Sequence, residues 1–117
     1  MNYLDNDYLI PVILGNDKEA IAAARLVFDK TGIRPYIFSS EFSLEQRLLY
    51  RCKKVSAQSQ LALILELCSF SQKHDAQGSP LLIYTDKNRQ FVQDHSDDIE
   101  SRYVTVSAQE LLSFPEE

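Results

Sequence analysis

The sequence predicts an α/β fold, a three-layer αβα sandwich built on a mostly parallel sheet of four or five strands. Short apolar runs without polar alternation, such as 10–14 and 81–84, are typical of strands that a parallel sheet buries on both faces. Segments in which apolar residues recur at helical spacing separate these runs, and glycine, proline and polar residues mark the boundaries. We expect one domain over residues 1–117, with residues 1–7 as a flexible lead-in.

The first strand is predicted over 8–14, a nearly continuous apolar run that ends at Gly15. Pro11 donates no hydrogen bond to a neighbouring strand, but it is tolerated near the start of one. The polar residues after the glycine are expected to form a tight turn. A strand followed by such a turn and a helix is how many nucleotide-type α/β domains begin.

A helix predicted over 18–31 follows this turn. Asn16 is in position to cap the helix, and Glu19, three residues later, completes the spacing of a capping box. The alanines in its apolar stripe allow the helix to lie close to the sheet, so its N-terminus should lie beside the strand ends. Gly32 is expected to end the helix as a left-handed residue.

The rest of the chain continues the alternation of strands and helices. Capping-box spacings that begin at Ser43 and Ser107 predict two short helices, and Ser59 or a neighbour caps a longer one. The longer helix is apolar around much of its cylinder, which indicates burial or contact with another domain. Strands are predicted over 36–38, 51–55, 80–84 and 103–106, and helices over 44–50, 60–73, 89–101 and 108–114.

Composition and charge narrow the functional classes. The net charge of −5 argues against a nucleic-acid partner bound through its phosphates. Residues 1–58 carry eight Lys or Arg and seven Asp or Glu, whereas residues 59–117 carry four and ten, which indicates an acidic solvated surface on the last helices. No apolar run approaches the roughly 20 residues of a membrane span, and the acidic N-terminus does not resemble a secretory signal. We therefore expect a cytoplasmic protein without a nucleic-acid or membrane partner.

Three polar turns are predicted to meet at the carboxyl ends of the parallel strands, where such sheets bind their ligands. A carboxylate at the end of a buried strand, as at Asp86, can receive an amine or a hydroxyl, or it can cap the next helix. Arginines near this edge can contact an anion, or they can remain solvated or ion-paired. The candidate substrate-binding residues are Gly15, Asn16, Asp17, Ser39 and Asp86, and the candidate anion contacts are Arg25 and Arg89.

The motifs of nucleotide binding and catalysis are not found. The first turn matches neither GxGxxG nor the P-loop pattern, and its single glycine cannot easily let the backbone wrap a pyrophosphate. Free N–H groups at the helix start could hold a carboxylate or a single phosphate; the alternative is a capped helix with no ligand. No nucleophile–base pair is apparent, and Cys52 and Cys68 lack the spacing of a zinc site or a disulfide framework. We expect no catalytic residue and no metal site in this chain.

The stretch 11–17, with 20–25 after it, resembles the opening of the pre-ATP-grasp domain of ATP-grasp carboxylate–amine ligases of the D-aspartate ligase type. The resemblance returns at 81–86, where an apolar strand ends in an aspartate, and continues through 102–104 and 110–112. It implies a Rossmann-like domain that positions an amino-acid or peptide substrate without itself being catalytic. The family's loop positions correspond to the candidate substrate-binding residues of the first turn and to Asp86, and its Ala-Arg corresponds to Arg25.

The resemblance also implies partners and cofactors outside this chain. In the family, an ATP-grasp body binds ATP and magnesium and joins a carboxylate to an amine through an acyl phosphate. No such body follows within the 117 residues, so we expect it in the same polypeptide or in a partner protein, and we expect no cofactor bound by this chain alone. The chain departs from the family pattern at Ile21 and Ala22, where an aromatic residue and a glycine are common, and at Thr85, where a glycine is common.

Two other classes stay open. The first is a free-standing interaction module with a Rossmann-like fold, which would dock a partner through the helix over 60–73, with Leu63 and Leu67 as its test residues. The second is a receiver-like or flavodoxin-like signalling domain, although the acidic pair that a phospho-acceptor site needs after the first strand is not found.

Overall fold

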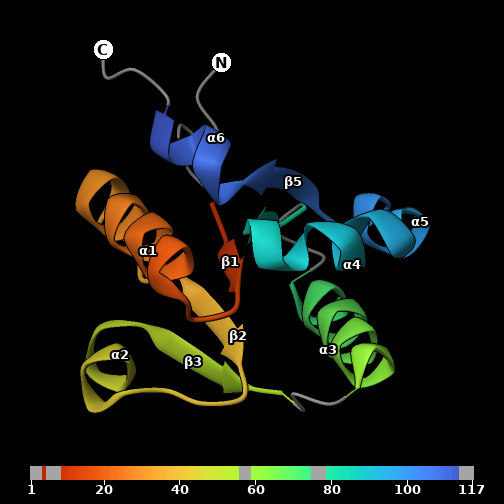
Figure 1. The fold of residues 1–117 in the computed structure, drawn as a ribbon, viewed down its shortest axis with the longest axis horizontal. Helices are drawn as coiled ribbons and strands as arrows, with labels where there is room; N and C mark the ends of the chain where they lie inside the picture. The colour runs from red at the N-terminus through yellow and green to blue at the C-terminus, as the bar shows by residue number, and fades with distance from the viewer. Residues whose placement is uncertain (1–3, 5–8, 56–58, 75–78, 114–117) are drawn as a thin grey trace.

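The computed structural model describes residues 4, 9–55, 59–74 and 79–113, and Figure 1 shows the arrangement of its helices and strands. The strands are β1 (Pro11–Leu14), β2 (Tyr36–Ser39), β3 (Arg51–Lys54), β4 (Leu81–Tyr84) and β5 (Val104–Ser107). The helices are α1 (Lys18–Thr31), α2 (Leu44–Leu49), α3 (Gln60–Lys73), α4 (Arg89–Asp94), α5 (Ser96–Glu100) and α6 (Ala108–Ser113), and a 3₁₀ turn, η2 (Asp86–Asn88), precedes α4.

The described strands form one five-stranded sheet in the order β3-β2-β1-β4-β5, and every neighbouring pair is parallel. Ile13 of β1 is in register with Ile37 of β2 and Ile83 of β4. The chain first builds outward from β1 to β3 and then returns to place β4 on the other side of β1, so the order switches between β1 and β4. This is the Rossmann order and not the 2-1-3-4-5 order of flavodoxin-like domains. The predicted α/β class and three-layer architecture are confirmed, and the receiver-like alternative does not fit.

The sheet is covered on both faces, which explains its unbroken apolar strands. Side chains alternate along a strand, so Ile13 faces the layer of α1 and α6, while Val12 and Leu14 face the layer of α3, α4 and α5. All three of these side chains are buried. Figure 1 shows α1 on one side of the sheet and α3 on the other. The core is therefore divided into two apolar clusters by the sheet.

Helix α1 has the predicted bounds, but its predicted cap is wrong. Asp17, not Asn16, is the N-cap, and its Oδ1 accepts a hydrogen bond from the Ala20 N–H at 2.8 Å. The Asn16 side chain donates instead to the Glu41 carbonyl, with 2.6 Å between Nδ2 and O. Glu19 is therefore the second helical residue, too close to the cap to close a capping box.

Two further differences arise after β4. The predicted helix over 89–101 is two short helices, α4 and α5, separated at His95, whose φ of −117° leaves the helical region. The predicted strand over 103–106 begins one residue later because the Tyr103 N–H donates to the Ile99 carbonyl in α5 and not to a neighbouring strand. The Tyr103 hydroxyl donates to the Leu67 carbonyl in α3, and burial raises the pKa of this phenol.

The first strand, predicted over 8–14, begins only at Pro11, because Leu9 and Ile10 precede the paired part of β1. The other boundaries agree with the predicted ones to within one residue. Gly32 has a φ of +73° and ends α1, and Ser43 and Gln46 form the predicted capping box of α2. The predicted edge strand over 51–55 is β3. The predicted lead-in falls outside the described residues except for Leu4, which packs against the α1 side of the core. In the described part of the chain, no helix combines the length and apolar character needed to span a membrane.

Candidate functional site

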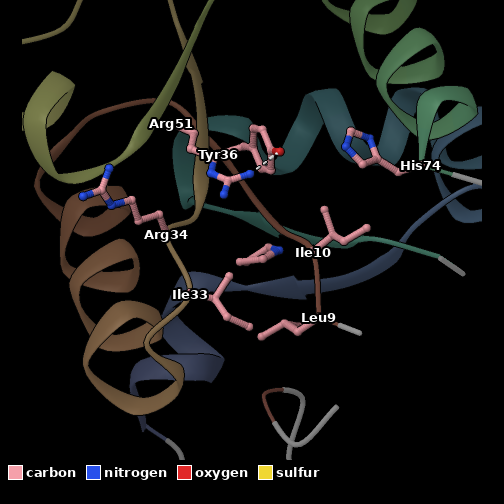
Figure 2. Close-up of a pocket in the computed structure, with 8 residues that line it drawn as sticks. Leu9, Ile10, Ile33, Arg34, Tyr36, Arg51 and His74 are labelled. Carbon is pink, nitrogen blue, oxygen red and sulfur yellow. Dashed lines mark hydrogen bonds between the residues drawn. The ribbon is translucent and has the colours of Figure 1, made fainter. Parts of the chain in front are cut away.

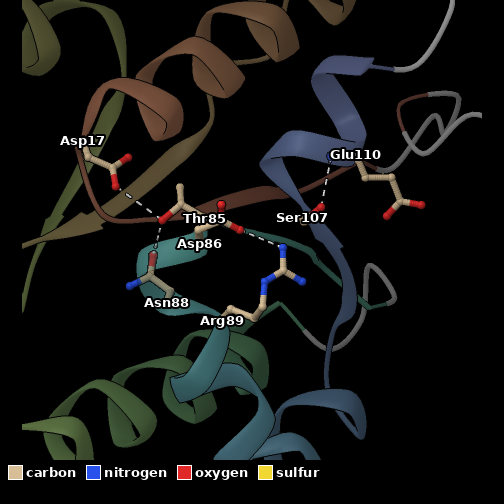
Figure 3. A network of polar contacts seen from close by, with 7 residues as sticks. All are labelled: Asp17, Thr85, Asp86, Asn88, Arg89, Ser107 and Glu110. Atoms are coloured by element: carbon tan, nitrogen blue, oxygen red, sulfur yellow. Dashed lines mark hydrogen bonds and ion pairs between the residues drawn. The ribbon is translucent and has the colours of Figure 1, made fainter.

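The two ends of the strands carry different surfaces. At their amino ends the described residues enclose a hollow with a volume of about 370 Å³ (Figure 2). At their carboxyl ends the loops carry a network of polar contacts (Figure 3). All of the predicted substrate-binding residues belong to the carboxyl-end loops or to the strand end before them, so this edge is the candidate site.

The structure brings the three predicted turns together. Because β2, β1 and β4 are adjacent and parallel, their following loops leave the same edge of the sheet. The Gly15 N–H donates to the Phe38 carbonyl at 2.7 Å, which joins the first loop to the end of β2. The Thr85 hydroxyl lies 3.4 Å from Asp17 Oδ2, which joins the same loop to the end of β4 (Figure 3). Ser39, at the end of β2, is half-buried beside them.

The conformation of Gly15 explains why a glycine ends β1. Its φ is +88°, a backbone conformation that residues with a Cβ atom rarely adopt. A Cβ atom at this position would lie 3.6 Å from Asn88 Oδ1, so the first loop runs close to the η2 turn after β4. The glycine thus permits the turn that places the N-terminus of α1 at the point where the strand order switches.

Thr85 fills the centre of this edge. It is buried, with 1% of its surface exposed, and its Oγ1 lies 3.0 Å from Asn88 Oδ1. A hydroxyl carries one proton, so it donates either to Asn88 or to Asp17 at any moment. Thr85 therefore links the loop after β1 to the loop after β4.

Asp86 and Arg89 contact each other on the open side of the same edge. Arg89 Nη2 lies 2.9 Å from Asp86 Oδ1, and this hydrogen bond is the main reason that the pKa of Arg89 is raised. Asp86 begins the η2 turn and does not cap α4. Both side chains are substantially exposed, so this ion pair is weak and can exchange with a ligand.

Arg25, the other predicted anion contact, lies farther along α1 than the remaining predicted site residues. It lies seven residues after the first residue of α1, which is about 10 Å along the helix axis. Its guanidinium lies 4.0 Å from the carboxylate of Glu45 in α2, and both side chains are mostly exposed. Arg89 is therefore the predicted anion contact that the fold keeps at the candidate site.

Glu19 also lies at this edge, although the sequence predicts for it only a role in a capping box. Its Oε1 is buried, and the described residues offer this oxygen no hydrogen-bond partner. Its charge adds a small contribution to the raised pKa of Arg89, after the larger effects of Asp86, so the two groups are within electrostatic reach. The polar run before the helix also offers Asp17 as the cap. With Asp17 as the cap, Glu19 does not form the reciprocal hydrogen bond of a capping box.

The described residues offer little for metal or covalent chemistry. Among them, no group of three or more His, Cys, Asp or Glu side chains could hold a metal ion. Cys52 and Cys68 are both free thiols. Desolvation raises the pKa of Cys52, although the charge of Arg47 opposes this effect. The thiol is therefore protonated at neutral pH. The arrangement at the carboxyl ends is suited to binding a polar group.

Comparison of the chain with protein-family models, with curated proteins and with solved structures gives no match. The fold and this edge define the class of protein: an α/β domain with the Rossmann strand order and a cluster of polar loops at its switch point.

Proposed function

We propose that the chain is the substrate-positioning domain of an ATP-grasp ligase, which joins a carboxylate to the amine of an amino acid or peptide. ATP and magnesium would bind to an ATP-grasp body in the same polypeptide or in a partner protein. The observation that carries the proposal is the meeting of the Gly15, Ser39 and Asp86 loops at the switch point of the sheet. The resemblance of 11–17 and 81–86 to pre-ATP-grasp domains supports the same assignment.

The charges at this edge favour an amino-acid ligand. Asp17 and Glu19 lie at the start of α1, and one buried oxygen of Glu19 has no partner in the described part of the chain. A protonated amine would supply the missing donor. Arg89 supplies the positive charge that an α-carboxylate would require. Held in this way, the substrate would be oriented for reaction, which is how a domain without catalytic residues can contribute to rate.

The exposure of the ion pair agrees with a site that two bodies share. The side chain of Asp86 is 65% exposed and that of Arg89 is 43% exposed. A ligand bound here would be covered on one side only. A second body over this edge would exclude water and strengthen both charged contacts.

A titration with D-aspartate tests the proposal, with N-acetyl-D-aspartate as the matched compound that has no charged amine. We expect D-aspartate to change the amide chemical shifts of Gly15 to Glu19 and of Asp86 to Arg89. Glu19→Gln keeps the side-chain shape but removes its charge, and we expect it to weaken the binding of D-aspartate about tenfold, or about 1.4 kcal/mol. Glu45→Gln, on α2, is the control and should leave this affinity unchanged.

Three results would contradict the proposal. They are equal effects of the two compounds, an unchanged affinity in Glu19→Gln, and micromolar binding of ATP with magnesium to this chain alone. The last result would mean that the nucleotide site lies within these 117 residues.

The exposed leucines of α3 support a second candidate, the free-standing interaction module. Leu61 is 67% exposed and Leu65 is 60% exposed, and they lie one helical turn apart. The predicted test residues, Leu63 and Leu67, do not form this face, because Leu67 is buried and Leu63 is partly buried against the core. If α3 docks a partner, Leu65→Glu should abolish an association that sizing chromatography detects, without lowering the melting temperature. An association that persists in Leu65→Glu argues against this face.

A further inference from the structure

A second binding site is suggested by the hollow at the amino ends of the strands, opposite the polar loops. Its apolar floor consists of Leu9, Ile10 and Pro11 at the start of β1 and Ile33 after α1 (Figure 2). Its volume of about 370 Å³ lies within the range of small-molecule sites, and apolar and polar side chains share its lining. The polar groups here are contributed by β2, β3 and the end of α3.

The guanidinium of Arg51 is the charged group that points across this hollow. Its Nη1 donates to the Tyr36 hydroxyl at 2.7 Å, and its Cζ lies 5.2 Å from the centre of the Tyr36 ring. Both contacts fix its direction but neither neutralises its charge. No carboxylate of a described residue lies within ion-pair distance of it. A guanidinium has five N–H donors, so most remain for a ligand.

Tyr36 and His74 form an aromatic wall beside this guanidinium. Their ring centres are 5.9 Å apart in an edge-to-face arrangement. His74 Nδ1 lies 2.9 Å from the Phe70 carbonyl, which can only accept, so Nδ1 carries a proton and Nε2 remains for another contact. Figure 2 shows the His74 ring extending from the end of α3 toward the other labelled side chains.

Arg34 lines the same hollow but is directed differently. Figure 2 shows its side chain extending away from the other labelled side chains. The two arginines are therefore unequal: Arg51 is oriented by Tyr36 across the hollow, whereas Arg34 contributes to its rim. This difference supplies a matched pair for an experiment.

We propose that this hollow binds a small organic anion, whose carboxylate or phosphate pairs with Arg51 and whose flat apolar body lies against Tyr36 and the apolar floor. A fork-shaped guanidinium binds both kinds of group through two parallel hydrogen bonds. The floor accounts for the apolar body, because an inorganic anion would leave it uncovered. The site is separate from the proposed amino-acid site, which lies at the other ends of the strands.

Benzoate is a suitable probe, with acetate as the anion without an apolar body and benzyl alcohol as the aromatic body without a charge. We expect benzoate to bind with a Kd on the order of 1 mM and to change the amide shifts of Ile10, Tyr36, Arg51 and His74. The other two compounds should bind at least fivefold more weakly. Phenyl phosphate, tested in the same way, distinguishes a preference for phosphate from one for carboxylate.

Arg51→Met keeps the apolar stem and removes the charge, and we expect it to weaken benzoate binding about tenfold. Arg34→Met is the control and should change it less than twofold. Arg51→Lys keeps the charge but loses the fork, so an intermediate loss is expected, and it provides a second variant if Arg51→Met lowers the melting temperature. The proposal is overturned if benzoate does not bind, if acetate binds as well as benzoate, or if the two arginine-to-methionine variants behave alike.

Discussion

Leu67→Ala is expected to lower the free energy of unfolding by about 3 to 4 kcal/mol. Leu67 is 1% exposed and belongs to the apolar cluster that α3 forms with Val12 and Leu82 on one face of the sheet. Truncation removes its buried methyl groups and leaves a cavity that the rigid strands cannot fill. The backbone carbonyl that receives the Tyr103 hydroxyl is retained, so the loss measures packing alone. Urea denaturation followed by circular dichroism gives the value.

Leu65→Ala, two residues earlier on the same helix, is the matched control. Leu65 is 60% exposed, and its replacement should change the free energy of unfolding by less than about 0.5 kcal/mol. Similar losses at the two positions would mean that α3 is rotated relative to the sheet. The pair also separates the side of α3 that stabilises the domain from the side that remains available to a partner.

Ala24→Leu is expected to lower the free energy of unfolding by about 2 to 3 kcal/mol. Ala20, Ala23 and Ala24 are fully buried where α1 packs on the sheet. A leucine has three more carbon atoms than an alanine, and the close packing of this interface leaves no room for them. The helix would have to move outward, which would also displace Asp17 and the loop that it joins to Thr85.

Ala22→Leu places the same side chain on the exposed face of α1 and should change the free energy of unfolding by less than about 0.5 kcal/mol. The two variants are compared by urea denaturation, and their amide spectra show whether Gly15 and Thr85 are disturbed in Ala24→Leu only. A leucine tolerated at position 24 as well as at position 22 would reveal unfilled space between α1 and the sheet.

The elements that could be predicted from the sequence are those whose boundaries depend on local interactions. Helix α3 begins after Ser59, whose hydroxyl accepts from the Ala62 N–H, and α1 ends at Gly32, which adopts a left-handed conformation. Both signals lie within a few residues of the helix ends that they define. The unbroken apolar strands likewise predict a sheet that is covered on both faces.

The features that could not be predicted depend on contacts between distant parts of the chain. Asn16 and Asp17 are equally suitable caps, and the Glu41 carbonyl decides between them by engaging the Asn16 side chain. Tyr103 resembles a strand residue, but its hydroxyl is bound by a carbonyl 36 residues earlier in the chain. Sequence spacing alone carries no information on either contact.

The sequence predicts where the loops of the candidate site meet, but it does not predict the individual contacts within the site. The meeting of the Gly15, Ser39 and Asp86 loops follows from the rule that parallel strands end at one edge. The unpartnered oxygen of Glu19 does not follow from it, because it depends on which residue caps α1. The hollow around Arg51 does not follow from the sequence either, because four separate segments line it and none of them carries a binding motif.

The charge of β3 has a consequence for self-association. This strand lies at the end of the sheet, and within the described part of the chain its outer edge is not paired with another strand. It is four residues long and carries Arg51, Lys53 and Lys54. Two molecules that aligned these edges would bring like charges together before any backbone hydrogen bond formed, and short, lysine-bearing edges of this kind resist the growth of one sheet into the next. The repulsion would weaken as ionic strength rises, so aggregation through this edge would be better suppressed in dilute buffer than in concentrated salt.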